Sequence, residues 1–348
     1  MALSLYLDTD RWRAHQRAVQ AEFPGLIPVV KGNGYGLGTR RLAEEAARLG
    51  TPMLAVGTVA EAAEAICWFD GEILVLTPYR VGEEPAALLR QVVRTATSIE
   101  ALQALAGTQV VVECMTSMSR HGIAKDDLAQ LAAVAGSVWL EGFALHLPLD
   151  RRDGSDPVDE VSGWVQAIAA AGLPTHTFYL SHLSADELAR LAERHPDTWF
   201  RSRIGTRLWL GDAGAMAARA TVLDVNPVAK GGRYGYRQHK AAAAGHLLVV
   251  AGGTVHGVGL EAPKYVHGLR PRVRGIIRAG LASVNRTMSP YRWQDRQLWF
   301  AEPPHMQVSL VFLPQAGQGE LDGRPAIGDE LPVNLRYTTT HFDRVAQL

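Results

Sequence analysis

The segment Val29–Gly38 carries the residues with the clearest chemical potential. It reads VVKGNGYGLG, so two valines lead directly into Lys31 and four glycines follow. A lysine at the C-terminal end of a barrel strand points into the barrel mouth, where desolvation lowers the pKa of its amine and makes it nucleophilic. The glycines let the backbone approach a ligand, and the Tyr35 hydroxyl can bind an anion. The alternative is an ordinary lysine beside a flexible turn, and the residue order of a phosphate-binding P-loop is absent.

The elements that must position Lys31 are short buried strands that alternate with helical segments over residues 1–222. The apolar runs and the segments with helical spacing predict parallel βα units, roughly seven or eight of them. This number favours a (β/α)8 barrel, with an open doubly wound sheet as the alternative. The expected strands include residues 26–30, 53–56, 73–76, 110–112 and 143–145, and the expected helices include residues 39–49, 60–68, 123–135 and 184–194.

The pattern changes in residues 223–348, where the helical spacing stops and glycine and proline separate strand-like segments. This half is expected to be a mostly-β domain. A stretch rich in glycine, lysine and arginine, residues 227–245, is expected to form a long loop that faces a site. The expected strands are residues 246–251, 271–278, 306–313 and 331–336.

Composition excludes several other classes of protein. The chain has 35 basic and 35 acidic residues, and this balance argues against a broad surface for nucleic acid or anionic membrane. Two cysteines, Cys67 and Cys114, cannot build a disulfide framework and fit a reducing compartment. No apolar run is long enough to span a membrane, and the charged N-terminus is not a signal peptide. No metal site is expected, because the histidines lack ligands at tight spacing. We therefore expect a soluble cytoplasmic protein.

The lysine segment resembles the cofactor-binding motif of the alanine racemase family, which are fold-type III enzymes dependent on pyridoxal 5'-phosphate (PLP). That family has an N-terminal (β/α)8 barrel followed by a β domain. The resemblance implies that PLP is the cofactor, that Lys31 binds it covalently as a Schiff base, and that Tyr35 donates a hydrogen bond to its phosphate.

Residues 203–211, RIGTRLWLG, are similar to a second motif of the family. The resemblance implies that Arg203 contacts the pyridine nitrogen and that the backbone of Gly205 and Thr206 binds the phosphate. A permanently charged guanidinium keeps this nitrogen unprotonated, which makes the ring a weaker electron sink and disfavours transamination. The alternative for Arg203 is a surface ion pair.

Two further residues match positions near the cofactor in the family. Ser184 resembles the phosphate-binding serine, and it could also cap the helix that follows, since both roles suit a helix N-terminus. His146 stands where the family has a histidine near the cofactor ring, and a structural histidine at a strand end is the alternative. His176 and His182 have no assigned counterpart.

The second acid–base group is expected from the β domain. Residues 231–236, GGRYGY, are similar to the segment that ends in the family's catalytic tyrosine, and this selects Tyr236, with Tyr234 as the competing choice. Racemisation needs one group on each face of the α-carbon, here Lys31 and the tyrosine. The tyrosine of the family reaches the partner's barrel, which implies a homodimer with shared sites. Met306 resembles the methionine whose backbone amide contacts the substrate carboxylate, and core packing is its alternative.

Residues 110–122 resemble a family segment but depart from it. The resemblance implies that Arg120 binds the substrate carboxylate. Glu113 replaces a lysine that many members carry in carbamylated form to orient this arginine, so we expect Glu113 to pair with Arg120. The alternative for Glu113 is a strand-end glutamate in solvent. The sequence Met115–Ser117 replaces Asp-Thr-Gly. The late phosphate-binding tyrosine of the family is either absent or is Tyr337.

The resemblance therefore predicts an amino-acid racemase of amino-acid metabolism that uses Lys31 and Tyr236 as its two bases. The altered residues keep two alternatives open. One is a different PLP reaction on the same scaffold, such as decarboxylation, aldol cleavage or a specialised biosynthetic step. The other is a PLP-binding protein without catalytic activity.

Overall fold

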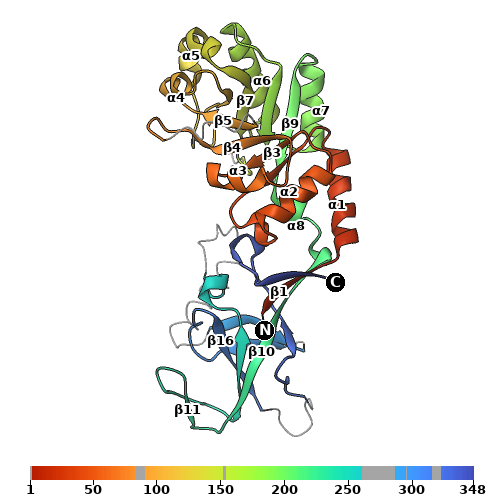
Figure 1. Ribbon diagram of the computed structural model, residues 1–348, viewed down its shortest axis with the longest axis vertical. Coiled ribbons are helices and arrows are strands. Elements are labelled where there is room, and N and C mark those ends of the chain that lie inside the picture. The colour runs from red at the N-terminus through yellow and green to blue at the C-terminus, as the bar shows by residue number, and fades with distance from the viewer. Residues whose placement is uncertain (1, 84–90, 152–153, 261–286, 295, 316–322) are drawn as a thin grey trace. The chain divides into compact units, whose positions relative to one another are not determined.

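The computed structural model describes the chain except residues 1, 84–90, 152–153, 261–286, 295 and 316–322 (Figure 1). It divides into two compact units. One unit is Arg13–Gly211, and the other combines Met1–Trp12 with Asp212–Leu348.

The first unit is a closed barrel of eight parallel strands, as the spacing of the apolar runs predicted. Strand β9 closes the barrel by pairing with β2, where Ile27 lies opposite Arg203. The predicted (β/α)8 barrel is confirmed, and the doubly wound alternative is not. The strands are β2 (Ile27–Val30), β3 (Met53–Val56), β4 (Glu72–Pro78), β5 (Val92–Ala96), β6 (Gln109–Glu113), β7 (Trp139–His146), β8 (Thr177–Ser181) and β9 (Trp199–Ile204).

Most helices of the first unit lie between barrel strands in the chain, and they surround the barrel in space (Figure 1). Several begin at side chains that accept backbone N–H groups. Thr58 and Ser184 form capping boxes, and Asp156 caps a helix whose first residue is Pro157. The helices are α1 (Thr9–Glu22), α2 (Thr39–Arg48), α3 (Val59–Ala65), α4 (Ile99–Ala104), α5 (Leu128–Val134), α6 (Pro157–Ala170), α7 (Ala185–Arg194) and α8 (Thr206–Leu210).

Alternate residues of β6 belong to different cores. Val111 packs inside the barrel with side chains from the other strands, including Val29 and Tyr179. Val110 and Val112 pack in the layer between the strands and the surrounding helices. This alternation follows from the two-residue period of a strand. It fixes which side chains at the strand ends point into the barrel mouth.

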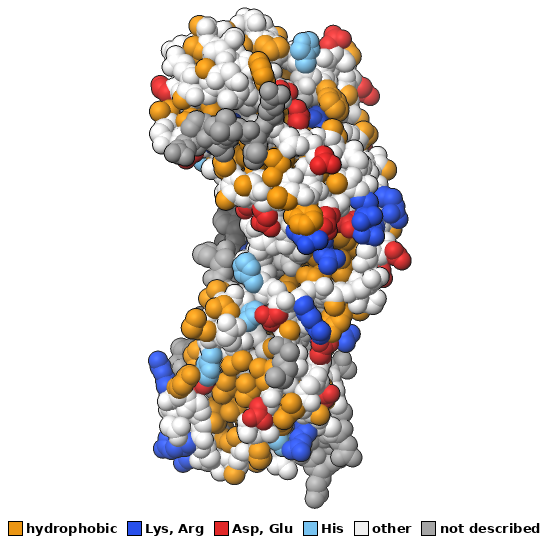
Figure 2. All heavy atoms as spheres, in the orientation of Figure 1, with side chains coloured by type: hydrophobic (Ala, Val, Ile, Leu, Met, Phe, Trp, Pro, Cys, Tyr) orange, Lys and Arg blue, Asp and Glu red, His pale blue; other side chains and the backbone are white. Residues whose placement is uncertain are grey.

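Charged side chains of α1 and α2 form ion pairs, one to a buried carboxylate and one exposed. Arg13 binds Glu45 at 2.6 Å, and Arg40 binds Glu44 at 3.0 Å. On the face in Figure 2, basic and acidic side chains lie beside one another.

The second unit is a mostly antiparallel sheet with the strand order β14-β15-β16-β13-β10-β1-β18, and β17 pairs with β10 at its side. Its core contains Leu3, Val250, Tyr291 and Val311. The predicted mostly-β domain is confirmed. The strands are β1 (Leu3–Leu7), β10 (Met216–Val228), β11 (Arg233–Tyr234), β12 (His239–Lys240), β13 (Gly245–Ala251), β14 (Met288–Trp293), β15 (Arg296–Phe300), β16 (Val308–Pro314), β17 (Glu330–Pro332) and β18 (Arg344–Gln347).

The division between the units differs from the expected boundary after residue 222. Strand β1 pairs antiparallel with β10, from Leu3 opposite Ala220 to Leu7 opposite Met216. The N-terminal segment and the first half of β10 therefore belong to the sheet, a long-range pairing that local spacing does not encode. The expected strand at residues 271–278 lies outside the described residues.

Among the described helices, none combines the length and the apolar character that crossing a membrane requires.

Candidate active site

Five charged or titratable side chains stand at the C-terminal ends of barrel strands. Lys31 follows β2, Glu113 ends β6, His146 ends β7, His182 follows β8, and Arg203 lies near the end of β9. Because all the strands are parallel, their C-terminal ends meet at one rim of the barrel. Active sites of such barrels lie at this rim.

The Lys31 loop is fastened to the loop after β3 by Glu61. One oxygen of this carboxylate accepts the N–H of Gly32 at 2.7 Å, and the other accepts the N–H groups of Gly57 at 2.6 Å and Thr58 at 3.1 Å. Charge-assisted hydrogen bonds of this kind are stronger than neutral ones. Glu61 therefore fixes the backbone directly beyond Lys31.

The protein environment activates the Lys31 amine. The side chain reaches solvent, but burial of the amine lowers its pKa, and the positive charges of Arg120 and Arg203 lower it further, while Glu61 opposes them. A lower pKa leaves more of the amine neutral and nucleophilic near neutral pH.

Tyr35 is buried in the glycine loop and lies against Gly205. Its backbone is left-handed, with φ 55°, and an added Cβ at Gly205 would clash with its hydroxyl oxygen. Burial and the nearby charge of Glu61 raise the pKa of Tyr35 to about 12. The phenol therefore stays protonated and keeps a proton to donate.

Arg203 forms a buried ion pair with Glu113, which corrects the expected pairing of Glu113 with Arg120. Arg203 Nη1 donates to Glu113 Oε2 at 3.3 Å, and both residues are less than one-tenth exposed. Glu113 has the same strand parity as Val111, which lies inside the barrel. It therefore points into the mouth, towards the guanidinium that β9 holds there.

One nitrogen of the Arg203 guanidinium remains available. Its Nη2 atom is buried and has no hydrogen-bond partner among the described residues. A buried donor without a partner is costly, so such an atom at a strand-end rim is a candidate contact for a ligand acceptor.

Arg120 lies in the exposed loop after β6. Within the described chain it has no ion-pair partner. Its charge lowers the pKa of both Lys31 and His146, so the guanidinium lies near the strand-end residues.

His146 and His182 form a pair of neutral imidazoles at the rim. Their rings meet edge to face with centroids 4.9 Å apart, and His146 Nδ1 lies 2.9 Å from Ser181 Oγ. Burial, together with Arg203 and Arg120, lowers the pKa of His146 to about 3. Burial and Arg203 also lower the pKa of His182. His182, which has φ 65°, is a rim residue to which the sequence assigned no role.

Ser184 caps α7. Its hydroxyl donates to Glu187 Oε2 at 2.9 Å and accepts the Glu187 N–H at 3.3 Å. The helix-cap alternative is therefore what the structure shows. To donate to a phosphate, the hydroxyl would have to leave Glu187. Thr206 is the exposed first residue of α8, which Trp209 ties to β2 through a hydrogen bond to Val29 O at 2.8 Å.

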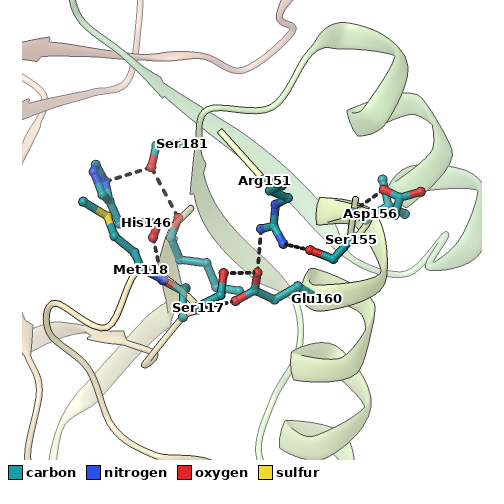
Figure 3. A network of polar contacts seen from close by, with 11 residues as sticks. Ser117, Met118, His146, Arg151, Ser155, Asp156, Glu160 and Ser181 are labelled. Atoms are coloured by element: carbon teal, nitrogen blue, oxygen red, sulfur yellow. Dashed lines mark hydrogen bonds and ion pairs between the residues drawn. The ribbon is translucent and has the colours of Figure 1, made fainter. Parts of the chain in front are cut away.

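The loop that carries Arg120 is held from two sides (Figure 3). Thr116 Oγ1 donates to the backbone oxygen of His146 at 2.6 Å. On the other side, Glu160 of α6 accepts the N–H of Ser117 at 2.7 Å and its hydroxyl at 2.8 Å. Arg151 donates to the same carboxylate at 2.5 Å.

In the second unit, the two candidate tyrosines differ sharply. Tyr236 is 85% exposed, whereas Tyr234 packs on Phe312 with nearly parallel rings, and burial raises the pKa of Tyr234. The exposed phenol is the one that can reach a reaction site elsewhere. Of the two phenols, that of Tyr236 is the more accessible to a ligand or a partner.

Tyr236 is positioned by a buried carboxylate. Glu302 accepts the Tyr236 N–H at 2.9 Å and lies 2.7 Å from His305 Nε2. The His305 ring lies against the Tyr236 ring, with centroids 4.6 Å apart. Gly235 permits this approach, because an added Cβ would clash with Glu302.

Met306 and Tyr337 also lie in the second unit. Met306 is 68% exposed, so its core-packing alternative does not describe this structure. Tyr337 packs on Phe342 at the core of the β unit, and burial raises its pKa.

Sequence reasoning missed Glu61, Glu160 and Glu302. The pattern Thr58-x-x-Glu61 is a capping-box signal and could have located Glu61. Glu160 and Glu302 carry no such local signal, because the backbone N–H groups that they accept, those of Ser117 and Tyr236, lie 43 and 66 residues away in the chain.

The fold and the residues at its rim place the protein among barrel proteins whose chain continues into a β unit. The model of the alanine racemase N-terminal domain matches residues 7–206, more than half of the chain, so the chain belongs to that family. A comparison with curated protein sequences gave no significant match.

Solved alanine racemases are similar to this chain in fold, three of them over nearly the full length of both chains. The enzyme from Bartonella henselae, solved with covalently bound pyridoxal phosphate, is 16% identical, with a TM-score of 0.72 over 100% of this chain and 99% of that one. The enzyme from E. faecalis is 19% identical, with a TM-score of 0.69 over 100% and 98%. That from the D-cycloserine producer Streptomyces lavendulae is 20% identical, with a TM-score of 0.66 over 100% and 97%. At these identities the likeness concerns the fold.

Proposed function

We propose that the protein is a PLP-dependent amino-acid racemase. The observation that carries the proposal is that two residues lie together at one barrel rim. One is Lys31, whose pKa is lowered, and the other is Arg203, whose buried Nη2 has no partner among the described residues. Membership of the alanine racemase family supports it.

The residues at the rim fit PLP. The free Nη2 of Arg203 suits the acceptor nitrogen of a pyridine ring, and the protonated Tyr35 hydroxyl suits a phosphate oxygen. Gly205 leaves the space in which Tyr35 sits. We propose that Lys31, Tyr35 and Arg203 hold the cofactor, assisted by His146, Ser184 and the backbone of Gly205 and Thr206.

When bound, PLP supplies an electron sink that acidifies the α-proton of an attached amino acid. Arg203, as a permanent cation, cannot accept the proton of the ring nitrogen and keeps that nitrogen an acceptor. The neutral His146 adds no charge that would repel Arg203. Lys31 has the lowered pKa that a base near neutrality requires, and we assign it to one face of the α-carbon.

We assign Tyr236 to the opposite face. Its phenol is exposed, and Glu302 holds its backbone. We propose that it acts in the barrel of a partner subunit, so that the functional unit is a homodimer. Arg120 and the backbone N–H of Met306 would hold the substrate carboxylate. A cytoplasmic role in amino-acid metabolism agrees with the two unpaired cysteines, Cys67 and Cys114.

The first test is the visible absorbance of protein loaded with PLP. We expect a band of lysine-bound cofactor that Lys31→Ala abolishes and that the control Lys230→Ala, an exposed lysine of the second unit, leaves unchanged. A band that persists in Lys31→Ala would overturn the assignment of the lysine.

The second test is deuterium incorporation at the α-carbon over a panel of amino acids in D2O. Wash-in accompanied by inversion is the expected result. Product without inversion would favour decarboxylation, aldol cleavage or a biosynthetic step. A normal band without wash-in or product would favour a non-catalytic PLP-binding protein.

A further inference from the structure

The loop between β6 and α5 is closed at its base by backbone hydrogen bonds, and its tip extends beyond them. At its base, Met115 N–H donates to Ile123 O and Ile123 N–H donates to Glu113 O, each at 2.9 Å. Gly122 allows the chain to return, because a Cβ there would clash with the backbone of Cys114. The tip, residues 116–120, projects beyond this base and carries Arg120.

Arg120 is not bound by Glu113, the carboxylate that the sequence led us to expect as its partner. Glu113 is bonded to Arg203, and Arg120 has no ion pair among the described residues. Its direction must therefore come from the backbone of the loop tip. That backbone is tied at Ser117, three residues before Arg120, to Glu160, and one residue earlier Thr116 ties it to the backbone oxygen of His146.

Glu160, Ser117 and Arg151 form a hydrogen-bonded contact, here called the clamp, that holds the loop tip to α6. Its carboxylate and the Arg151 guanidinium are each mostly buried, with 17% and 12% of the side chains exposed. Burial would raise the pKa of Glu160, but the hydrogen bonds from Ser117 and Arg151 lower it overall. Arg151 is itself fixed by Ser155 at 3.2 Å (Figure 3). The carboxylate is thus charged and rigid, and it binds both donors of Ser117.

We propose that Glu160, neutralised by Arg151 and bound to Ser117, is a positioning residue that aims Arg120 at the carboxylate of the amino-acid substrate. The inference rests on the proposed function. It also explains the serine at position 117: its hydroxyl supplies the second of the two bonds to Glu160, which a residue without a side-chain donor cannot make.

The substitution Glu160→Gln tests the clamp, because an amide keeps the size but replaces one acceptor oxygen by a donor that faces Ser117 and Arg151. We expect KM for the amino acid to rise on the order of ten-fold, as the loss of about 1.4 kcal/mol of binding requires, while kcat changes less than two-fold. The absorbance band of lysine-bound cofactor should not move. The matched control is Asp159→Asn, the same change one residue earlier in α6, where the carboxylate forms an exposed pair with Arg194.

Two readouts do not depend on turnover. Hydrogen exchange of the peptide spanning residues 114–122 should accelerate in Glu160→Gln but not in Asp159→Asn. Propionate, a small carboxylate, should slow phenylglyoxal modification of Arg120 in the wild-type protein, and this protection should need about ten-fold more propionate in Glu160→Gln.

Serine variants keep the test valid if Glu160→Gln does not fold. Ser117→Ala removes one donor and should give a smaller change in the same direction, and Ser117→Thr, which keeps the hydroxyl, should restore the wild-type values. Faster exchange with unchanged KM and unchanged propionate protection would overturn the positioning role, and unchanged exchange would overturn the clamp. Failure of the proposed function would instead appear in wild-type protein as the absence of a Lys31-dependent band.

Discussion

Glu113 and Arg203 meet inside the barrel mouth, with Glu113 Oε2 accepting a hydrogen bond from Arg203 Nη1 at 3.3 Å. The pair joins the ends of β6 and β9 across the barrel. The Nη2 atom of Arg203 has no hydrogen-bond partner among the described residues, and Glu113 binds Arg203 instead of Arg120.

The substitution Glu113→Gln should destabilise the first unit. It leaves a buried guanidinium without its counter-charge, and a loss of about 1–3 kcal/mol in the free energy of unfolding is expected. Urea unfolding measures it. Glu44→Gln removes the exposed partner of Arg40 and should cost less than about 1 kcal/mol. Equal effects of the two substitutions would contradict the buried pair.

The substitution Glu61→Gln should lower the pKa of Lys31, because the Glu61 charge raises that pKa against burial and the two arginines. The rate at which trinitrobenzenesulfonate labels Lys31 in the apoprotein, measured against pH, reports the pKa. The midpoint should shift to lower pH, and Glu64→Gln, an exposed change in the same helix, should leave it in place. A shift to higher pH would argue against the electrostatic role of Glu61.

The substitution Gly205→Ala should weaken PLP binding, because the added methyl group displaces the Tyr35 hydroxyl. We expect the dissociation constant to rise by about ten-fold or more, which corresponds to about 1.4 kcal/mol. Fluorescence titration of the apoprotein with PLP measures it. Gly136→Ala, where an added Cβ meets nothing within 4 Å, is the control. Unchanged affinity would remove Tyr35 from the proposed phosphate site.

Substitution of each of the two tyrosines by phenylalanine should show that Tyr236 contributes to activity and not to stability. Tyr236→Phe should reduce racemisation on the order of 100-fold or more, because it removes a positioned acid–base group, and should change unfolding by less than about 0.5 kcal/mol, because the ring is exposed. Tyr234→Phe should change the rate little. A large rate loss only in Tyr234→Phe would reverse the assignment.

Acid should destabilise the protein through His146. Its folded pKa, lowered to about 3, lies below the unfolded value near 6.5, so between these values the unfolded chain binds a proton that the folded chain does not. Stability therefore falls as pH decreases from about 6.5 towards 3. Replacing the imidazole in His146→Gln should flatten this part of the pH–stability curve measured by urea unfolding. An unchanged slope would show that the imidazole is protonated in the native state.

Local sequence predicted the barrel and the position of its candidate active-site lysine. Short apolar runs alternate with segments of helical spacing, and this local period suffices to predict parallel βα units. Lys31 could be located because it directly follows one such run and precedes a glycine loop. The resemblance to the family then named Tyr35, Arg203 and Tyr236 as site residues.

Tertiary structure decided the partners. Glu113 binds a residue 90 positions away because strand parity points both side chains into the same mouth, and Ser117 binds Glu160 because α6 returns beside its loop. Strand β1 pairs with β10, which lies more than 200 residues further along the chain. The spacing of apolar residues depends only on neighbours in the sequence, so helices and strands can be predicted from the chain itself. The choice of an ion-pair or strand partner depends on which distant segments the closed barrel and the sheet bring together.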